Sequence, residues 1–120
     1  MDYLEKIKQN AKKFIINKEL LKISKDAHKA YFYARDILKG RFLKGEKAIS
    51  KDTDFAYLYA RDILKGRFEQ GEAAISEKAN YSYLYAKYIL KCRFELGEAA
   101  ISSNTEYSYY YAKDVLMIKL

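Results

Sequence analysis

Three nearly identical segments and the start of a fourth make up most of this chain. Each carries the motif Tyr-x-Tyr-Ala, and the first tyrosines of the motif, Tyr31, Tyr57, Tyr83 and Tyr109, lie 26 residues apart. Self-similarity with a period of about 20 to 50 residues is typical of stacked supersecondary units and not of a single closed core. The repeat therefore constrains the architecture of this chain more than any other feature.

Each repeat begins with a pattern that predicts a capped long helix. Asp26, Asp52 and Asn104 hold one position in three of the units, where a side-chain oxygen can accept from the free amides of a first helical turn. Lys78 holds this position in the remaining unit, so we expect that helix to begin at Ser76 or to lack a side-chain cap. Apolar residues at helical spacing follow in every unit.

A turn and a second, shorter helix are expected after the long helix. Gly40 and Gly66 follow its last periodic residue, which predicts that they adopt the left-handed conformation that ends many helices. Cys92 holds this position in the third repeat and is expected to be strained there, so that Cys92→Gly would stabilise the fold. Phe68 and Ile75, with their counterparts in the other repeats, then share one inward face of the short helix.

Together these patterns predict an all-α fold, a short αα-hairpin solenoid with a right-handed stack of about four units. The expected parts of this single domain, residues 1–120, are a degenerate N-terminal capping repeat at 1–29, repeats at 30–55, 56–81 and 82–107, and a C-terminal half-repeat at 108–120. The first segment is assigned as a cap because it keeps helical spacing and an Ile23-Ser24 pair but lacks the tyrosine motif.

Residues that carry catalytic chemistry are scarce. His28 is the only histidine and Cys92 the only cysteine, and no glycine-rich phosphate loop is present. Glu46, Glu72 and Glu98 recur one whole unit apart, and packed helices about 8 to 10 Å apart are too distant to share one metal ion. We expect these glutamates to pair with a nearby Lys or Arg or to accept from a tyrosine hydroxyl. The sequence predicts a non-enzymatic protein with no metal and no cofactor.

Tyrosine is unusually frequent, at 13 of 120 residues, whereas tryptophan is absent. Most of these rings fall in three columns, Tyr31/Tyr57/Tyr83/Tyr109, Tyr33/Tyr59/Tyr85/Tyr111 and Phe55/Tyr81/Tyr107. Two interpretations remain open. The rings build the core between units with their hydroxyls at the rim or bonded to an acceptor, or one column lines a binding surface.

Four apolar residues fall on the otherwise polar side of the long helices, where they either pack on the adjacent long helix or form, with neighbouring basic residues, an exposed mixed ridge. It consists of Phe32, Arg35, Leu58, Arg61, Leu84, Lys87, Tyr110 and Lys113. The leading functional hypothesis is that this ridge binds a partner protein. On that hypothesis, reversing the charge of Arg35 and Arg61 abolishes partner capture without unfolding the chain.

The net charge of +7 comes from the N-terminal part of the chain. The first 29 residues are rich in lysine and contain no arginine, and we single out Lys6, Lys8, Lys12, Lys13, Lys22 and Lys25. These lysines are either a solvated face of the cap or an electrostatic docking site for nucleic acid or an acidic protein. Nonspecific, salt-sensitive binding of nucleic acid is the alternative function.

The run from Tyr59 to Ile75, Tyr-Ala-Arg-Asp-Ile-Leu-Lys-Gly-Arg-Phe-x-x-Gly-Glu-x-x-Ile, resembles a short tandem αα repeat of phage, giant-virus and bacterial proteins. The resemblance covers Ala30 to Leu116. In the family, Trp often replaces this Phe and Asp-Pro often opens the helix, whereas this chain has no proline. The resemblance implies a viral or mobile-element protein without catalytic activity, and possible roles include a phage-type inhibitor of a host system.

Two further expectations concern assembly and location. Tyr110, Met117, Ile118 and Leu120 lie in the half-repeat that lacks Lys-Gly-Arg-Phe, so a homo-oligomer formed through this part of the chain is a third hypothesis. One cysteine, no visible secretory signal and no long apolar stretch predict a cytoplasmic protein without a membrane partner, located in the host cytoplasm if it is viral.

Overall fold

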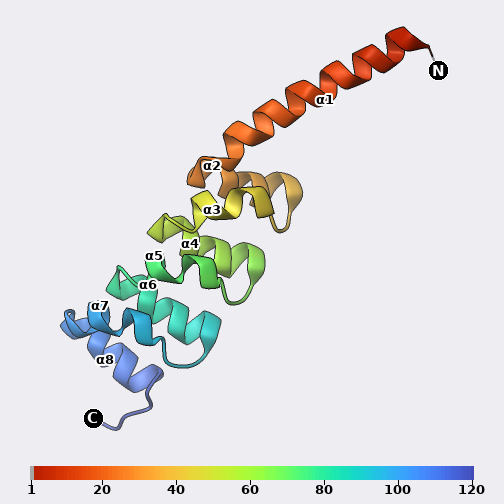
Figure 1. Ribbon diagram of the computed structural model, residues 1–120. Coiled ribbons are helices and arrows are strands. Elements are labelled where there is room, and N and C mark those ends of the chain that lie inside the picture. Colours follow the sequence, from red (N-terminus) through yellow and green to blue (C-terminus); the bar gives the residue numbers. More distant parts are fainter. Residues whose placement is uncertain (1) are drawn as a thin grey trace.

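The computed structural model describes residues 2–120, and this part of the chain is all-α, as predicted (Figure 1). No strand occurs within residues 2–120. The helices follow one another along a long axis, and the molecule measures 75 × 20 × 18 Å. The N-terminal and C-terminal helices therefore lie at opposite ends of an elongated molecule.

Three successive units share one order of elements: an α-helix that widens into a π-helical segment, then a 3-10 turn and a short α-helix. After α1 (Tyr3–Ser24), the first unit contains α2 (Ala27–Phe32), Tyr33–Leu38, Leu43–Gly45 and α3 (Glu46–Ile49). The second contains α4 (Thr53–Tyr59), Ala60–Leu64, Glu69–Gly71 and α5 (Glu72–Ile75), and the third α6 (Ala79–Leu84), Tyr85–Leu90, Glu95–Gly97 and α7 (Glu98–Ser102). The α8 helix (Thr105–Asp114) follows as the counterpart of α2, α4 and α6.

The long helices begin where the sequence predicts. Asp26, Asp52 and Asn104 each accept a hydrogen bond from the amide three residues further on, at 2.9 Å. Lys78 precedes α6 and provides no side-chain cap, which is one of the two outcomes expected for it. The side-chain caps satisfy a free amide in the first turn of α2, α4 and α8.

The left-handed residue that ends each long helix lies one position earlier than predicted. It is Lys39 (φ 51°), Lys65 (φ 51°) and Lys91 (φ 57°), and no glycine in the described part of the chain has a positive φ. Met117 (φ 58°), the equivalent residue of the last unit, lies beyond the end of α8. The prediction for Gly40, Gly66 and Cys92 was therefore wrong. The last turn is π-helical, and the amides of Lys39 and Gly40 both bond to the Ala34 carbonyl, so the chain leaves the helix sooner. Cys92 has an ordinary backbone conformation, and the reason for expecting Cys92→Gly to stabilise the fold disappears.

The core lies between the long and short helices of each unit. Phe68 and Ile75 are 4 % and 0 % exposed, which confirms the inward face predicted for the short helix. The chain is closely packed at Gly71, where a Cβ atom would lie 2.6 Å from the Phe68 ring and 3.0 Å from the Ala56 Cβ atom. Glycine is needed at this position because of close packing and not because of its backbone angles.

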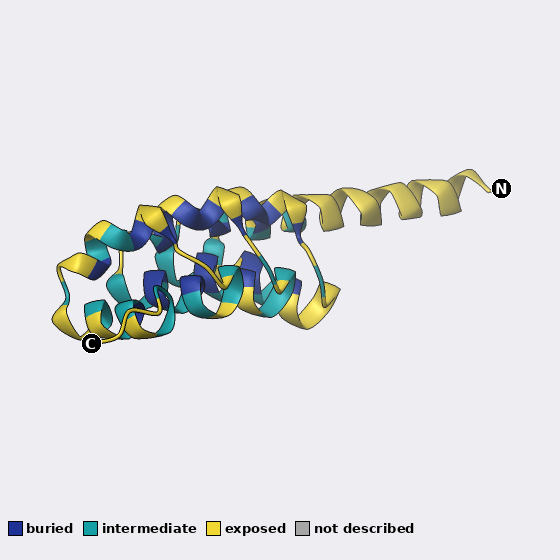
Figure 2. Ribbon diagram, turned by 90° about the horizontal axis from the view of Figure 1, so that it is seen from below, coloured by how far each residue is buried: buried dark blue, intermediate teal, exposed yellow. Residues whose placement is uncertain are grey.

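The N-terminal segment, expected to be a degenerate capping repeat, is a single 22-residue helix. Only its end packs against the units: Ser24 is buried and Ile23 contacts the core. The remainder of α1 projects along the molecular axis, and every residue of it except the half-buried Leu20 is exposed (Figures 1 and 2). Apolar side chains expected to cap the stack, such as Leu4 and Ile7, are 65 % and 62 % exposed.

Candidate functional site

A carboxylate that is buried in the first two units and half-buried in the third joins each unit to the next long helix. Glu46 receives two hydrogen bonds from the Arg41 guanidinium, at 2.7 and 3.0 Å, and a third from the Tyr59 hydroxyl of the following unit. The same hydroxyl accepts from the Phe42 amide at 3.0 Å. This carboxylate clamp recurs in Arg67–Glu72–Tyr85–Phe68 and in Arg93–Glu98–Tyr111–Phe94. The structural role expected for the three glutamates is confirmed.

In the first clamp, the carboxyl and the phenol have pKa values shifted in opposite directions. Burial favours a higher pKa for the Glu46 carboxyl, but hydrogen bonds from Arg41 and Tyr59 outweigh it and lower the pKa. Burial and the bond to Glu46 raise the pKa of the Tyr59 hydroxyl well above its usual value. Because a general base works best with a pKa near the operating pH, a carboxyl with a lowered pKa and a phenol with a raised pKa are poorly suited to proton transfer near neutral pH.

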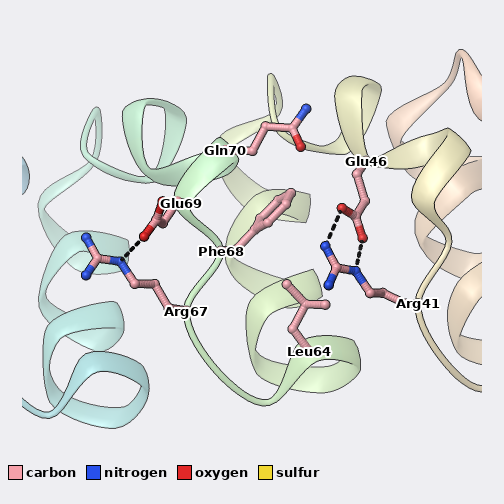
Figure 3. A pocket seen from close by; sticks show the side chains of 7 residues that line it. All are labelled: Arg41, Glu46, Leu64, Arg67, Phe68, Glu69 and Gln70. Atoms are coloured by element: carbon pink, nitrogen blue, oxygen red, sulfur yellow. Dashed lines mark hydrogen bonds and ion pairs between the residues drawn. The ribbon is translucent and has the colours of Figure 1, made fainter.

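A surface hollow of about 420 Å³ lies beside two of these clamps (Figure 3). Its lining residues are Arg41, Glu46, Leu64, Arg67, Phe68, Glu69 and Gln70. Arg41 pairs with Glu46, Arg67 lies 3.7 Å from Glu69, and Leu64 and Phe68 lie between these two pairs. Each cation of the hollow already has a carboxylate partner, so the hollow offers no uncompensated charge to a ligand.

The first tyrosine column forms a second link between units. Tyr31, Tyr57 and Tyr83 are 2 %, 4 % and 7 % exposed, whereas Tyr109 is 48 % exposed. Tyr31 donates to Asp62 of the next unit at 2.6 Å, and Tyr83 donates to Asp114. Of the two interpretations of the tyrosine columns, the structure favours a core in which the hydroxyls are bonded to carboxylates.

The third unit interrupts this second link. Asp36, Asp62 and Asp114 share one position of the repeat, at which the third unit has Tyr88. Tyr57 therefore faces the phenol of Tyr88 at the position where Tyr31 and Tyr83 have a carboxylate partner. Burial raises the pKa of the Tyr57 hydroxyl. Lys87 also lacks an aspartate next to it in sequence, and it pairs with Asp114 at 3.3 Å.

The predicted partner-binding ridge runs along the long helices. Its apolar members, Phe32, Leu58, Leu84 and Tyr110, are half-buried, Arg35, Arg61 and Lys113 are exposed, and Lys87 is half-buried. Two hydrogen bonds hold Arg35 on Asp36, and Arg61 is held on Asp62 in the same way. The Arg35 guanidinium also lies 4.4 Å from the Phe32 ring centroid. Much of the basic charge of the ridge is therefore paired within the protein, and its role in binding stays a prediction.

The lysines predicted to contact nucleic acid are divided between two places. Lys6, Lys8, Lys12, Lys13 and Lys22 lie on the exposed surface of α1. Lys8 is 3.6 Å from Glu5 and Lys22 is 3.5 Å from Glu19, distances that give weak surface pairs. Lys25 instead follows α1 and lines a groove at the junction with α2 and α3.

Sequence reasoning missed the other basic residues of this groove. Lys44, Lys47 and Lys51 line it together with Lys25, and the groove has a volume of about 440 Å³. The signal that could have identified them lies in the repeat itself. The second unit has Gln70, Ala73 and Glu77 at the three equivalent positions.

The remaining candidate residues are exposed but are not brought together into a site. Met117, Ile118 and Leu120 are 76 %, 48 % and 79 % exposed, and self-association through them stays a prediction. His28 is exposed and stacks on Phe55 at 5.2 Å between ring centroids. Within residues 2–120, no group of three or more His, Cys, Asp or Glu side chains could hold a metal ion. No helix in this part of the chain has both the length and the apolar character needed to cross a membrane.

No family model matches the chain, and no curated protein and no solved structure matches it significantly.

Proposed function

We propose that this chain is a non-enzymatic interaction protein that docks onto another protein through an apolar stripe on α1. The stripe consists of Leu4, Ile7, Ala11, Phe14 and Ile15, whose spacing places them on one face of the helix. Ile7 and Phe14 are 62 % and 68 % exposed. A contiguous apolar surface left in water is typical of an interaction site, and this uncovered stripe is the observation on which the proposal rests.

The partner surface that fits the stripe is an apolar groove with an acidic rim. At about 100° per residue, Lys8 and Lys12 border the stripe on one side and Lys6 and Lys13 border the other. An amphipathic helix that lays its apolar face into such a groove is a recurring mode of recognition. A second copy of α1 fits less well, because it would bring the same excess of lysine against the stripe.

We also propose that the three units and α8 form a short right-handed αα-hairpin solenoid. The support is that identical clamps, Glu46–Tyr59, Glu72–Tyr85 and Glu98–Tyr111, join every successive pair of units. In this proposal the stack is the rigid support from which α1 projects. The motif resemblance alone supports placing the protein in a viral or mobile-element setting and in the cytoplasm of a host.

Site-specific photo-crosslinking tests the docking surface. A photoreactive residue at Phe14 is expected to form a covalent adduct with one partner protein in cells that produce this chain. The matched control at Gln9, on the opposite face of α1, is expected to form no such adduct. Ile7→Gln combined with Phe14→Gln is expected to abolish binding of the partner identified in this way while leaving the helical content unchanged.

Three results would contradict this proposal. If the probe at Phe14 formed adducts only with a second copy of the chain, the stripe would be a self-association surface and not a docking site for another protein. Adducts from a probe at Leu58 but not at Phe14, lost on reversing Arg35 and Arg61, would move the site to the ridge on the long helices. Equal adducts from Gln9 and Phe14 would show that contact with α1 is not specific to its apolar stripe.

A further inference from the structure

We propose that the groove at the junction of α1, α2 and α3 binds the phosphate backbone of nucleic acid without reading its sequence. This basic groove is lined by Ser24, Lys25, Ala27, Lys44, Lys47, Ala48 and Lys51. Its four lysines come from the end of α1, the 3-10 turn, α3 and the turn after α3. The fold therefore gathers, around one hollow of about 440 Å³, charges that are up to 26 residues apart in sequence.

The positive charge of the basic groove is not compensated by the protein. Every charged residue in its lining is a lysine. None of the four lysines forms an ion pair with a carboxylate of residues 2–120. The neighbouring carboxylates of Asp26 and Asp52 accept hydrogen bonds from helix amides as N-caps. Four like charges around one hollow attract a polyanion and repel one another without it.

The other units show that the fold does not need this charge. The positions of Lys25, Lys44, Lys47 and Lys51 are held in the next unit by Lys51, Gln70, Ala73 and Glu77, and in the third by Glu77, Leu96, Ala99 and Ser103. The equivalent surface thus changes from four positive charges to one charge of each sign and then to a single negative charge. Since all three units keep the same clamps, the lysines of the first unit serve a purpose other than folding.

The placement of the charges favours a phosphate backbone over an acidic protein. Lys18, Lys22 and Lys25 follow one another at spacings of four and three residues, so they extend the basic groove along one face of α1. Duplex DNA carries about one negative charge per 1.7 Å of its axis, a density that suits a continuous row of ammonium groups. Lysine ammonium groups act as point charges that contact phosphates, and the groove has no amide or guanidinium group of the kind that reads base edges.

This inference is independent of the proposed protein docking. The apolar stripe lies in the outer half of α1, between Leu4 and Ile15, whereas the basic groove begins at Ser24. Loss of one activity is therefore expected to leave the other intact.

Fluorescence anisotropy with labelled DNA of random sequence, as a duplex of about 20 base pairs and as a single strand, tests the basic groove. The full chain is expected to bind both at about 25 mM salt and to lose affinity steeply towards about 200 mM. The test variant is Lys44→Gln, Lys47→Ala and Lys51→Ser, which installs residues already present at these positions in later units. Its circular dichroism is expected to be unchanged, and the slope of log Kd against log salt for the duplex is expected to fall by roughly 2 to 3.

The matched control removes the same charge elsewhere. Lys65→Asn, Lys91→Asn and Lys119→Gln change three exposed lysines outside the basic groove, and this control is expected to bind DNA with an unchanged salt slope. Absence of binding by the full chain at about 25 mM salt would overturn the proposal. If the salt slope fell equally in the test variant and the control, DNA binding would depend on the net charge of the protein and not on the basic groove. Displacement of DNA by polyglutamate at the same charge concentration would assign the groove to an acidic protein segment.

Discussion

At the scale of single residues, two glycines five positions apart have different roles. A Cβ atom on Gly71 would lie 2.6 Å from the Phe68 ring, whereas on Gly66 its nearest neighbour would be the Leu64 carbonyl oxygen at 3.8 Å. We expect Gly71→Ala to lower the free energy of unfolding by about 1 to 3 kcal/mol through overpacking. Gly66→Ala is expected to raise it by about 0.4 to 1 kcal/mol, because alanine restricts the unfolded chain. Urea unfolding followed by circular dichroism measures both, and equal effects would contradict the packing argument.

Tyr88 provides a second prediction at this scale. Tyr88→Asp gives the third unit the carboxylate that Asp62 and Asp114 provide for Tyr31 and Tyr83. We expect the free energy of unfolding to rise by about 1 kcal/mol, the usual net value of such a hydrogen bond. The readout is thermal or urea unfolding of the variant beside the natural chain.

The control for this substitution is made at the proposed donor. In a chain with Tyr57→Phe, which lacks the hydroxyl, Tyr88→Asp is expected to give no gain. If the gain persists there, it arises from replacing an exposed tyrosine, which is 55 % exposed, and not from a restored bond to Tyr57.

The sequence predicted some residues and missed others for physical reasons. The role of Glu46 was predictable because a carboxylate repeated beside Arg and Tyr requires partners when it is buried. The left-handed residue was misplaced by one position, on Gly40 instead of Lys39. That register depends on whether the last turn of the helix is α or π, and side-chain periodicity does not distinguish these two endings over a single turn.

At the scale of elements, the carboxylate clamps predict how stability depends on pH. The Arg93 guanidinium lowers the pKa of Glu98, and Arg61 lowers that of Asp62. Their stabilisation is complete above the unfolded-chain values of about 4 to 4.3 and is lost as the pH falls through the lowered values. Burial raises the pKa of Tyr111 to about 12, so stability also decreases as the pH rises above the unfolded value of about 10. We expect the Tm to be constant between these limits.

Thermal unfolding followed by circular dichroism across this pH range provides the measurement. Glu98→Gln is the control, because it keeps the shape of the side chain but cannot ionise. We expect it to lower the Tm near neutral pH and to reduce the loss of Tm in acid. An acid limb identical to that of the natural chain would show that Glu98 does not contribute.

The direction of α1 could not be read from helical periodicity alone. In the first unit, the left-handed Lys39 reverses the direction of the chain after the long helix. The absence of a side chain at Gly45 then lets the short helix pack closely against the long one. The other units have equivalent residues. The equivalent positions in the N-terminal segment are Lys13 and Glu19, and Leu20 stands where Glu46 forms its clamp. Because the N-terminal segment lacks the glycine and the carboxylate, it forms no turn and no second helix, and α1 extends away from the units as one helix.

At the scale of the whole molecule, the excess of positive charge and the projecting helix α1 both belong to the N-terminal part of the chain. The lysine-rich α1 forms one end of the 75 Å axis, the basic groove lies where α1 meets the first unit, and the units that follow carry balanced charge. Composition revealed this asymmetry, but not the groove. A groove forms only where the fold brings particular turns close together. Lys44, Lys47 and Lys51 form a basic groove because the fold places them around the same hollow as Lys25.

The projection of α1 gives the protein a size in solution that can be measured. The Cα radius of gyration is 19.3 Å, whereas a compact domain of this length is expected to have a value of about 14 Å. We expect small-angle X-ray scattering from monomeric protein to give a radius close to 19.3 Å and a distance distribution with a long tail. If α1 folded back over the units, its apolar stripe would be covered, the radius would fall towards the compact value, and Ile7→Gln with Phe14→Gln would increase it. An extended radius that these substitutions leave unchanged is the result expected for a stripe that remains free for a partner.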